Sequence, residues 1–461
     1  MNLAVFGTGK VYASCKHLLE KHRIVCLLDN DAGKQGTQID GIRVIAPEAV
    51  RNVSFDRICI LTDKYYEEIR HQLISLGVEA GRLLSVHDVS FLDGRKAVFV
   101  PLQQQAPDAG KKALVVTNGL SLTGAPLAAF YAVRFLAKHG YAVTVVSPED
   151  GPLKDEYACL PCDVMLCRDL FAYSLQFLPD IEEQSLVLIN TVTFYYLLKH
   201  RDKRQRVIWW IHEASEFYQA VPPSWARAVD LEHVDVYAVS GIAKENFQRI
   251  WKRDAGLLRY GLMNLAAQPA KEHSASRGLV FAFVGTITKR KGVDVLLEAI
   301  GKLPESYRER CMFLIAGNLP PAQAMTWERE MVERLQGVSR LKLCGLLTRG
   351  EMAAFYQDID VLICPSREDP LPMVVTEAMM YGKPVVMSSS GIGQAEEVTD
   401  RRNGLLFRNG DAGALCDCMK WAIDHKAELP QIGAEGRKIF EAKFSQASFE
   451  RSMQRILDDD G

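Results

Sequence analysis

Asp369 and Glu377, two carboxylates with seven residues between them, are the pair whose type and spacing best indicate a chemistry in this sequence. Asp369 follows an apolar run at 361–365 that is predicted to be a strand, and Glu377 lies in the first turns of a helix predicted over 373–381. In open α/β sheets, ligands bind at the carboxyl ends of strands, and a helix that starts there attracts anions. Carboxylates in such a place can accept hydrogen bonds from sugar hydroxyls. The pair therefore predicts a site for a diphosphate that carries a sugar, whereas the alternative is that both acids only offset the helix dipole.

A basic turn upstream fits the same chemistry. Lys289, Arg290 and Lys291 lie between a strand predicted at 279–285 and an amphipathic helix predicted at 293–303. Cations at this end of a parallel sheet could clamp phosphates, and the alternative is a solvated basic turn. Further apolar runs at 312–317 and 341–345 each end at a glycine. Strands that alternate with helices over 279–407 predict a doubly wound α/β half.

From these residues outward, the chain resembles the retaining glycosyltransferases of family 4. The matching segments are FVGTITKRKGVDVLLEAI at 283–300, the loop and helix at 364–384, and SGIGQAEEVTDRRNGLLF at 390–407. The resemblance covers roughly residues 112–455, and its specific part lies in the C-terminal half. It implies an α/β protein of the GT-B fold, in which two Rossmann-like domains face each other.

The resemblance also implies roles for individual residues. Asp369 matches the acid that contacts hydroxyls of the donor sugar, and Glu377 matches the acid that contacts the nucleotide ribose. Lys291, supported by Arg290, matches the lysine that neutralises the donor diphosphate. Glu396 falls at a further acidic position of the family, before the Asn403-Gly404 turn, and its role there is less certain. The predicted donor site is completed by Gly285, Thr286, Glu368, Leu371 and Met373.

The sequence departs from the family pattern at three of these positions. Asp369 is one methylene shorter than the usual glutamate, so either Glu368 contributes or the loop is drawn in. Where the family often has Phe-Gly, this chain has Leu371-Pro372, and a proline has no backbone N–H to donate to the sugar. An arginine often follows the strand glycine, but this chain has Thr286. Either Arg290 replaces that charge or phosphate is bound more weakly.

The N-terminal half of the resemblance offers two candidate residues. A strand predicted at 112–117 leads into a loop that contains Gly124, which could let the backbone approach a phosphate or an acceptor. The alternative is a plain turn glycine. His212 follows a strand predicted at 207–211, and the resemblance places such a histidine near the primary hydroxyl of the sugar. The alternative for His212 is a structural, hydrogen-bonded ring.

A further domain is expected before the transferase. Gly7-Thr8-Gly9 follows a strand predicted at 2–6, and Asp29 ends a second strand after a helix predicted at 11–21. This is a partial dinucleotide fingerprint, in which Tyr12 occupies the place of the third glycine. We favour an interaction or oligomerisation role, which would make the protein a homo-oligomer, over nucleotide binding.

Three domains follow from this organisation. They are a small Rossmann-like accessory domain at 1–100, an acceptor-side domain at 112–265, and a donor-binding domain at 278–461 with a returning C-terminal helix. The segments 101–112 and 266–278, rich in small and polar residues, are predicted to be linkers.

Composition narrows the class of protein. A net charge of −2 and a pI near 6.6 argue against a nucleic-acid partner. The sequence shows no apolar run of membrane-spanning length and no charged-then-apolar leader, so we expect a cytoplasmic protein. The 11 cysteines are scattered, and Cys159, Cys162 and Cys167 lack a fourth ligand with zinc spacing. We therefore expect no metal and no cofactor.

A basic segment bears on partners. Residues 199–206 read KHRDKRQR and precede Trp209-Trp210. Such a segment could hold the protein at the anionic inner face of a membrane, where lipid-linked acceptors lie. The alternative, which we favour, is a solvated loop before a buried strand.

Together these observations predict a metal-independent retaining glycosyltransferase of the hexosyltransferase type. Its donor would be a nucleoside diphosphate sugar such as a UDP- or GDP-sugar, and its acceptor a glycan or a lipid-linked molecule in surface polysaccharide synthesis. Two alternatives stay open: a catalytically inactive partner subunit with the transferase fold, and a sugar-nucleotide epimerase of the same fold.

Overall fold

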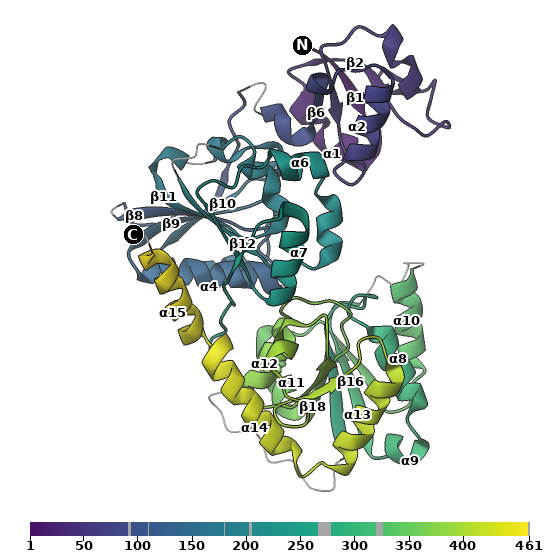
Figure 1. Ribbon diagram of the computed structural model, residues 1–461, viewed down its shortest axis with the longest axis vertical. Coiled ribbons are helices and arrows are strands. Elements are labelled where there is room, and N and C mark those ends of the chain that lie inside the picture. Colours follow the sequence, from purple (N-terminus) through teal and green to yellow (C-terminus); the bar gives the residue numbers. More distant parts are fainter. Residues whose placement is uncertain are drawn as a thin grey trace. The chain divides into compact units, whose positions relative to one another are not determined.

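The computed structural model describes residues 1–90, 94–108, 110–178, 180–201, 205–265, 278–319 and 326–459. The chain divides into two compact units (Figure 1). The first contains Met1–Tyr237 and Asn246–Ala255, and the second contains Ala238–Glu245 and Gly256–Gly461. Within the described ranges, no helix has both the length and the apolar character that crossing a bilayer requires.

The first unit begins with a sheet in the order β3-β4-β2-β1-β5-β6, which we call the accessory module. Its central strands are parallel, as expected. Three of its strands were not predicted, because β3, β4 and β6 are only two to four residues long and carry little periodicity. The strands are β1 (Asn2–Phe6), β2 (Arg23–Leu28), β3 (Gln38–Ile39), β4 (Ile42–Ile45), β5 (Arg57–Ile60) and β6 (Leu83–Ser85).

The helix predicted at 11–21 is shorter than expected. It consists of α1 (Lys10–Cys15) followed by a 3₁₀ turn at Lys16–Leu19. The side chains of Ser14 and Cys15 both donate to carbonyls four residues earlier. Such bonds compete with the helical ladder and bend it, which accounts for the change of helix type here. The module also contains α2 (Tyr66–Ser75).

The second sheet of this unit contains the consecutive strands β13-β12-β11-β8-β9-β10-β7. Parallel pairs join β12, β11, β8, β9 and β10, and β7 runs antiparallel to β10 at the edge. The strands are β7 (Val100–Gln103), β8 (Lys111–Val116), β9 (Tyr141–Ser147), β10 (Cys162–Leu166), β11 (Gln184–Ile189), β12 (Arg206–Ile211) and β13 (Val234–Ala238). The helices are α4 (Gly124–Lys138), α5 (Leu153–Tyr157), α6 (Pro223–Ala228) and the second half of α7 (Gly241–Trp251), whose first five residues belong to the second unit.

The linker predicted at 101–112 is wrong in its first part, because β7 belongs to the sheet. Gln103 fixes this strand: its Nε2 donates to the carbonyls of Tyr157, Leu160 and Cys162 at 3.1, 3.0 and 2.8 Å. Gln103, one of the polar residues that suggested a linker, therefore anchors β7 to the segment that leads into β10. Of the second predicted linker, all residues but the last lie outside the described ranges.

The second unit holds a six-stranded parallel sheet in the order β17-β16-β15-β18-β19-β20, of which Figure 1 labels β16 and β18. The strands are β15 (Leu279–Val284), β16 (Cys311–Ala316), β17 (Leu341–Gly345), β18 (Val361–Cys364), β19 (Val385–Ser388) and β20 (Leu405–Phe407). The short strand β14 (Gly256–Leu257) precedes them. The helices are α8 (Val293–Lys302), α9 (Glu305–Arg308), α10 (Trp327–Gln336), α11 (Arg349–Asp358), α12 (Met373–Met380), α13 (Ala412–Asp424), α14 (Leu429–Ile439) and α15 (Gln446–Asp458).

The strands β15 and β18 are almost entirely buried, as expected for the centre of a doubly wound sheet. They pair directly with each other, although they are far apart in the sequence. Their carboxyl ends therefore meet at one edge. This topology places the basic turn after β15 beside the acidic loop after β18.

A charged junction ties the accessory module to the rest of the first unit. Asp88, which is 7% exposed, accepts hydrogen bonds from Lys199 Nζ (2.8 Å) and His200 Nε2 (3.1 Å). The Nζ of Lys199 also lies 3.7 Å from the centre of the Trp225 ring. The start of the basic segment 199–206 is thus engaged by the module, and residues 202–204 lie outside the described ranges.

A buried histidine completes the junction. His87 is 4% exposed, and its ring stacks on Tyr196 with a centroid separation of 4.1 Å. Its Nδ1–H donates to the carbonyl of Phe171, and its Nε2–H faces both carboxylate oxygens of Asp63 at 3.0 Å. Because both ring nitrogens meet acceptors, the geometry favours the doubly protonated, charged ring.

Candidate functional site

The candidate site of the second unit is built where two loops meet. The backbone N–H of Arg367 donates to the carbonyl of Arg290 at 2.8 Å. Gly292 ends the basic turn with a φ of +70°, and a Cβ at this position would lie 2.0 Å from the carbonyl oxygen of Pro365. Glycine is therefore required here both by the left-handed backbone and by the contact. These constraints hold the basic turn against the acidic loop.

The contact of the two loops brings the predicted cations to the predicted acid. Lys291 Nζ lies 2.5 Å from Asp369 Oδ2, and Arg290 Nη1 lies 3.9 Å from Asp369 Oδ1. Arg290 also donates to the carbonyl of Glu368 at 3.1 Å. Asp369 is 8% exposed, and its own N–H donates to the carbonyl of Gly391 at 2.6 Å. The loop is thus drawn in toward the lysine.

Arg367 holds this arrangement, although its sequence context does not indicate such a role. Both of its terminal nitrogens lie 2.8 Å from the carboxylate of Asp294 in the first turn of α8, and Nη1 also donates to the carbonyl of Lys289 at 2.6 Å. A bidentate arginine–carboxylate pair fixes direction as well as distance. Arg367 therefore fastens the acidic loop to both ends of the basic turn. Its partner is 73 residues away in the sequence, so local pattern could not identify it.

Glu377 lies in the second turn of α12 and has one side-chain partner in the described residues. The hydroxyl of Tyr356, on α11, donates to Glu377 Oε2 at 2.7 Å. Burial raises the pKa of Glu377 to about 7, although the hydrogen bond from Tyr356 and the charge of Arg349 act in the opposite direction. Glu377 can therefore gain or lose a proton near neutral pH, which the sequence did not indicate.

The remaining predicted donor residues surround these groups. Gly285 directly follows β15, and a Cβ placed on it would come within 3.9 Å of Lys291 Cδ. Thr286 follows it and is exposed. Leu371 is buried, and its carbonyl accepts a hydrogen bond from Tyr260 at 2.6 Å. Met373 opens α12 and is partly buried.

The start of α12 is fixed by a residue that the sequence reasoning did not select. Gln394 is fully buried, and its Nε2 donates to the carbonyl of Pro372 and to Thr376 Oγ1, both at 2.9 Å. Pro372, which replaces a common glycine, thus finds a structural use as the cap of α12. Its position in the sequence could have pointed to it, because Gln394 lies inside the segment 390–407 that carries the resemblance.

Glu396 lies away from the lysine cluster, at the start of α7. A Cβ on Gly241 would lie 2.6 Å from Glu396 Oε1, so this carboxylate sits directly against the first residue of α7. Burial raises the pKa of Glu396, and the charge of Arg259 opposes this. A carboxylate at a helix start stabilises the helix dipole, which is a structural use for this acid.

The predicted residues of the first unit form a second group. His212 Nε2–H donates to Asn190 Oδ1 at 2.8 Å, and Asn190 Nδ2 donates to the carbonyl of Ala125 at 2.6 Å. Ala125 is the second residue of α4, which begins at Gly124. The ends of β11 and β12 are therefore tied to the start of α4. A Cβ on Gly124 would meet nothing within 4 Å, so packing alone does not require glycine there.

The hydrogen bonds of Asn190 decide the tautomer of His212. The Nδ2 of Asn190 is used by Ala125, so its Oδ1 faces the histidine and accepts the proton of Nε2. Burial lowers the pKa of His212 to about 3, so the ring is neutral at neutral pH. Nδ1 therefore carries no proton and can accept a hydrogen bond from a hydroxyl. Glu213 supports the turn by accepting the His212 N–H at 2.8 Å.

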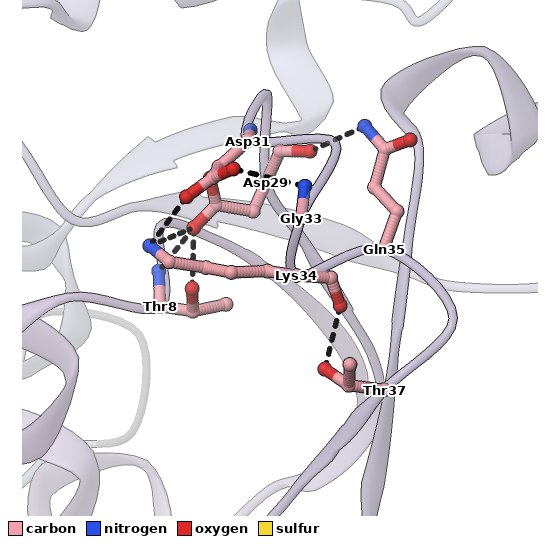
Figure 2. A network of polar contacts seen from close by, with 7 residues as sticks. All are labelled: Thr8, Asp29, Asp31, Gly33, Lys34, Gln35 and Thr37. Atoms are coloured by element: carbon pink, nitrogen blue, oxygen red, sulfur yellow. Dashed lines mark hydrogen bonds and ion pairs between the residues drawn. The ribbon is translucent and has the colours of Figure 1, made fainter.

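The accessory module does not present its acid to a ligand (Figure 2). Asp29 Oδ2 accepts hydrogen bonds from Thr8 N and Lys34 Nζ, both at 3.2 Å, and from the Thr8 hydroxyl, while Oδ1 accepts from Asp31 N at 2.9 Å. Burial alone would raise the pKa of Asp29, but these bonds outweigh it and hold the pKa below its usual value. The residue that would bind a ribose in a dinucleotide fold is thus satisfied internally.

The structure therefore assembles the predicted residues in two groups, one in each unit. Lys291, Arg290 and Asp369 form the first with Glu377 on the neighbouring helix, and His212 forms the second with the start of α4. Among the described residues, no group of three or more His, Cys, Asp or Glu side chains could hold a metal ion.

Three protein-family models match three separate parts of the chain. Residues 278–425 match the model described as glycosyl transferases group 1, and residues 109–254 match glycosyl-transferase family 4. Residues 1–84 match a model described as C2185-like, N-terminal.

Curated relatives match part of the chain. A D-inositol 3-phosphate glycosyltransferase of Corynebacterium diphtheriae is 28% identical over 182 residues, which are 39% of this chain and 42% of the relative. The lipopolysaccharide core biosynthesis glycosyltransferase LpsE of Rhizobium meliloti is 24% identical over 224 residues, which are 47% of this chain and 62% of LpsE. The chain thus spans less than two thirds of the length of these relatives.

Solved structures share the fold. HepE of Anabaena in complex with UDP and glucose superposes with a TM-score of 0.64 at 16% identity, and the match covers 76% of this chain and all of HepE. WaaG, a glycosyltransferase involved in lipopolysaccharide biosynthesis, gives a TM-score of 0.57 at 14% identity over 75% of this chain and 99% of WaaG.

The two Rossmann-like halves thus define the GT-B fold, and the predicted fold class is confirmed. The chain belongs to the glycosyltransferases of the family 4 type, with an added N-terminal module that has a family model of its own.

Proposed function

We propose that this protein is a retaining, metal-independent hexosyltransferase. It moves a sugar from a nucleoside diphosphate sugar, such as a UDP- or GDP-sugar, to a glycan or lipid-linked acceptor in the cytoplasm. LpsE, a relative named for lipopolysaccharide core biosynthesis, supports a role in a surface polysaccharide. HepE, which shares the fold, has been solved with UDP-glucose and supports a nucleotide sugar as donor.

The observation that carries this proposal is the contact of Lys291 and Arg290 with Asp369 at the carboxyl ends of β15 and β18. Two cations and a carboxylate are the groups needed at the bond between a diphosphate and a sugar. When the donor binds, its phosphate oxygens replace Asp369 as the partner of Lys291, and Asp369 turns to the sugar hydroxyls. The positive charge that a metal ion could supply to the leaving diphosphate comes from the two side chains.

The reaction then proceeds on one face of the sugar. The bond between the anomeric carbon and the diphosphate oxygen breaks, and the acceptor oxygen forms a bond to the same carbon from the same side. The acceptor proton passes to the departing diphosphate oxygen. In this scheme Asp369 orients the sugar, and a covalent sugar–carboxylate intermediate is the alternative mechanism. His212, neutral and with a free acceptor at Nδ1, suits a sugar hydroxyl.

A panel of nucleotide sugars tests the donor. Thermal unfolding should shift upward for one nucleotide class, since a ligand at 100 times its Kd adds about 2.7 kcal/mol of stability. The anomeric configuration of the product, read by NMR, should equal that of the donor. An inverted product would overturn the retaining assignment.

Chelation tests the charge assignment. Activity should survive EDTA, because Lys291 and Arg290 stabilise the leaving group. Loss of activity with EDTA and recovery with Mn²⁺ would show that a metal ion is part of the mechanism.

A catalytically inactive partner subunit is the second candidate. It is favoured by Thr286 and Pro372, which depart from the family pattern, and by Lys291, whose charge is already paired. Such a subunit would show no thermal shift with any nucleotide sugar. Turnover of a nucleotide sugar without an acceptor would instead indicate an epimerase.

A further inference from the structure

Tyr356 connects α11 to the carboxylate of Glu377. Its side chain is 1% exposed, and its ring stacks on Tyr381 at a centroid distance of 5.4 Å and an interplanar angle of 12°. The stacking fixes the place of the hydroxyl, which lies 2.7 Å from Glu377 Oε2 and 3.3 Å from the carbonyl oxygen of Val374. One hydroxyl thus stands between two acceptors on α12.

The two oxygens of Glu377 have different surroundings. Oε2 accepts the hydrogen bond of Tyr356, whereas no hydrogen bond to Oε1 is found among the residues that the structure describes. The residue is partly exposed, which leaves Oε1 as the oxygen for a ligand. A carboxylate held at one oxygen presents the other in a fixed direction, which reduces the freedom lost when a ligand hydroxyl binds.

We propose that Tyr356 is a positioning residue of the donor site, which holds Oε2 of Glu377 so that Oε1 accepts a hydroxyl of the nucleotide ribose. This inference rests on the proposed function, because it takes the donor to be a nucleotide.

The hydroxyl of Tyr356 serves both protonation states of Glu377. When Glu377 is ionised, Tyr356 donates to Oε2. When Glu377 is neutral with its proton on Oε2, that proton can be donated to the oxygen of Tyr356, and the hydrogen of Tyr356 can turn to the carbonyl of Val374. Neither state leaves the tyrosine hydroxyl without an acceptor.

The ionised state is the one that binds a ribose hydroxyl well, since bonds to a charged acceptor are the stronger ones. The groups around Glu377 are Tyr356 and Arg349 of α11, Tyr381 of α12, and Tyr260 before β15. Of these, Tyr356 and Arg349 favour the charged carboxylate. Removing the Tyr356 hydroxyl should therefore move the ionisation of Glu377 to higher pH.

The test is isothermal titration of the full-length protein with UDP and with GDP between pH 5.5 and 8.5. Wild type should bind one of them more tightly as pH rises, because Glu377 ionises over this range. Tyr356→Phe keeps the stacked ring and removes the hydroxyl. It should weaken binding about tenfold at neutral pH, the usual size for a hydrogen bond to a charged group, and should shift the midpoint of the pH dependence upward.

Tyr381→Phe is the matched control, because Tyr381 belongs to the same stacked pair but contacts Glu377 only through its backbone N–H, which the substitution keeps. It should keep the wild-type midpoint. In a Glu377→Gln background, Tyr356→Phe should leave the pH dependence unchanged. These readouts separate positioning from packing, because a loss of packing alone would not move a titration midpoint.

The outcomes distinguish the two levels of inference. Failure of the wild type to bind either nucleotide would count against the proposed donor class and against the role of Tyr356 with it. Wild-type binding together with an unchanged affinity and midpoint in Tyr356→Phe would overturn the positioning role alone. Equal shifts in Tyr356→Phe and Tyr381→Phe would assign the effect to the stacked pair as packing, and would also overturn it.

Discussion

At the scale of single residues, Lys291 and Asp369 neutralise each other in the structure while each has a separate part in the proposed reaction. Donor binding must therefore exchange one partner for another at both side chains. Lys291 has one ionic partner before binding, Asp369, and one after binding, the phosphate. Because Lys291 is already desolvated against Asp369, donor binding does not add that desolvation cost. The lysine then stabilises the diphosphate more strongly as negative charge develops on the leaving oxygen in the transition state.

Lys291→Ala should accordingly lower the rate far more than the donor affinity. We expect a fall in kcat of about 10²- to 10³-fold, the usual size for removal of a group that stabilises developing charge, with a much smaller change in Kd. Steady-state kinetics combined with direct titration separate the two effects. Lys289→Ala is the control, since Lys289 is exposed and faces the Trp327 ring at 5.7 Å. Equal losses in binding and turnover would make Lys291 a uniform binding group.

Glu377→Gln should weaken nucleotide binding and turnover while the fold stays intact. The change should also affect stability in a defined pH window. The folded-state pKa of Glu377 is raised from 4.5 to about 7, so its contribution to stability is fully present below pH 4.5 and is lost as pH rises through 7. Thermal unfolding of Glu377→Gln should lack this decline. Unchanged affinity for the free nucleoside diphosphate would remove Glu377 from the site.

The residues that we propose to face a ligand were predictable, and the residues that hold them were not. Asp369, Lys291 and His212 stand at strand ends, where topology alone indicates a role. Arg367 and Tyr356 have partners 73 and 21 residues away, and their function depends on which loops and helices meet. The raised pKa of Glu377 depends on burial, which no single-sequence pattern reports.

At the scale of elements, the effect of removing the accessory module on stability depends on whether β7 is removed with it. A chain that starts after Gln104 loses β7, the three hydrogen bonds of Gln103 and the cover of the edge of β10. A chain that starts just before Val100 retains all of these. The longer truncation should therefore lower the unfolding temperature of the remaining first unit more than the shorter one, as measured by calorimetry.

Donor binding should survive in both truncations, since the residues assigned to the donor in the second unit are retained. If the shorter truncation folds but no longer binds donor, the accessory module is part of the active machinery. If both truncations melt at the same temperature, β7 contributes nothing to the sheet. Strongly apolar elements such as β15 and β18 were predictable from their continuous apolar runs. The strand β7 was not, because its four residues include a proline and read as a polar linker.

At the scale of the whole molecule, the junction of the accessory module should respond to pH. Burial lowers the pKa of His87, but the charge and hydrogen bond of Asp63, the Phe171 carbonyl and Asp88 outweigh it, so the folded-state pKa is raised. The resulting stability is fully present below about pH 6.5 and is lost as pH rises through the raised pKa. Hydrogen exchange around Val86–Asp88 should therefore become faster above that pH than intrinsic rates predict.

His87→Gln should abolish this pH dependence while Asp88 keeps Lys199 and His200 as partners. A dependence of the same size in His87→Gln would show that other groups control the junction. Burial alone would raise the pKa of Asp88, but the bonds from His200 and Lys199 outweigh it and lower the pKa. The contribution of Asp88 to the stability of the junction is therefore lost only in acid. The two groups thus stabilise the junction over different parts of the pH scale.

The junction also sets a limit on how the module could be exchanged between proteins by recombination. The family model for the module ends at residue 84, whereas its docking residues, His87 and Asp88, lie just beyond that boundary. Their partners, Phe171, Lys199 and His200, lie 84 to 112 residues further along the chain, in the next domain. A gene fusion that transplants residues 1–84 onto another transferase would carry the sheet, with His17 and Glu67 that contact Asp169 and Ser224, but would lose the contacts of His87 and Asp88. A chimera that keeps residues 1–90 would gain these further contacts only where the recipient offers cations to Asp88 and an acceptor to His87.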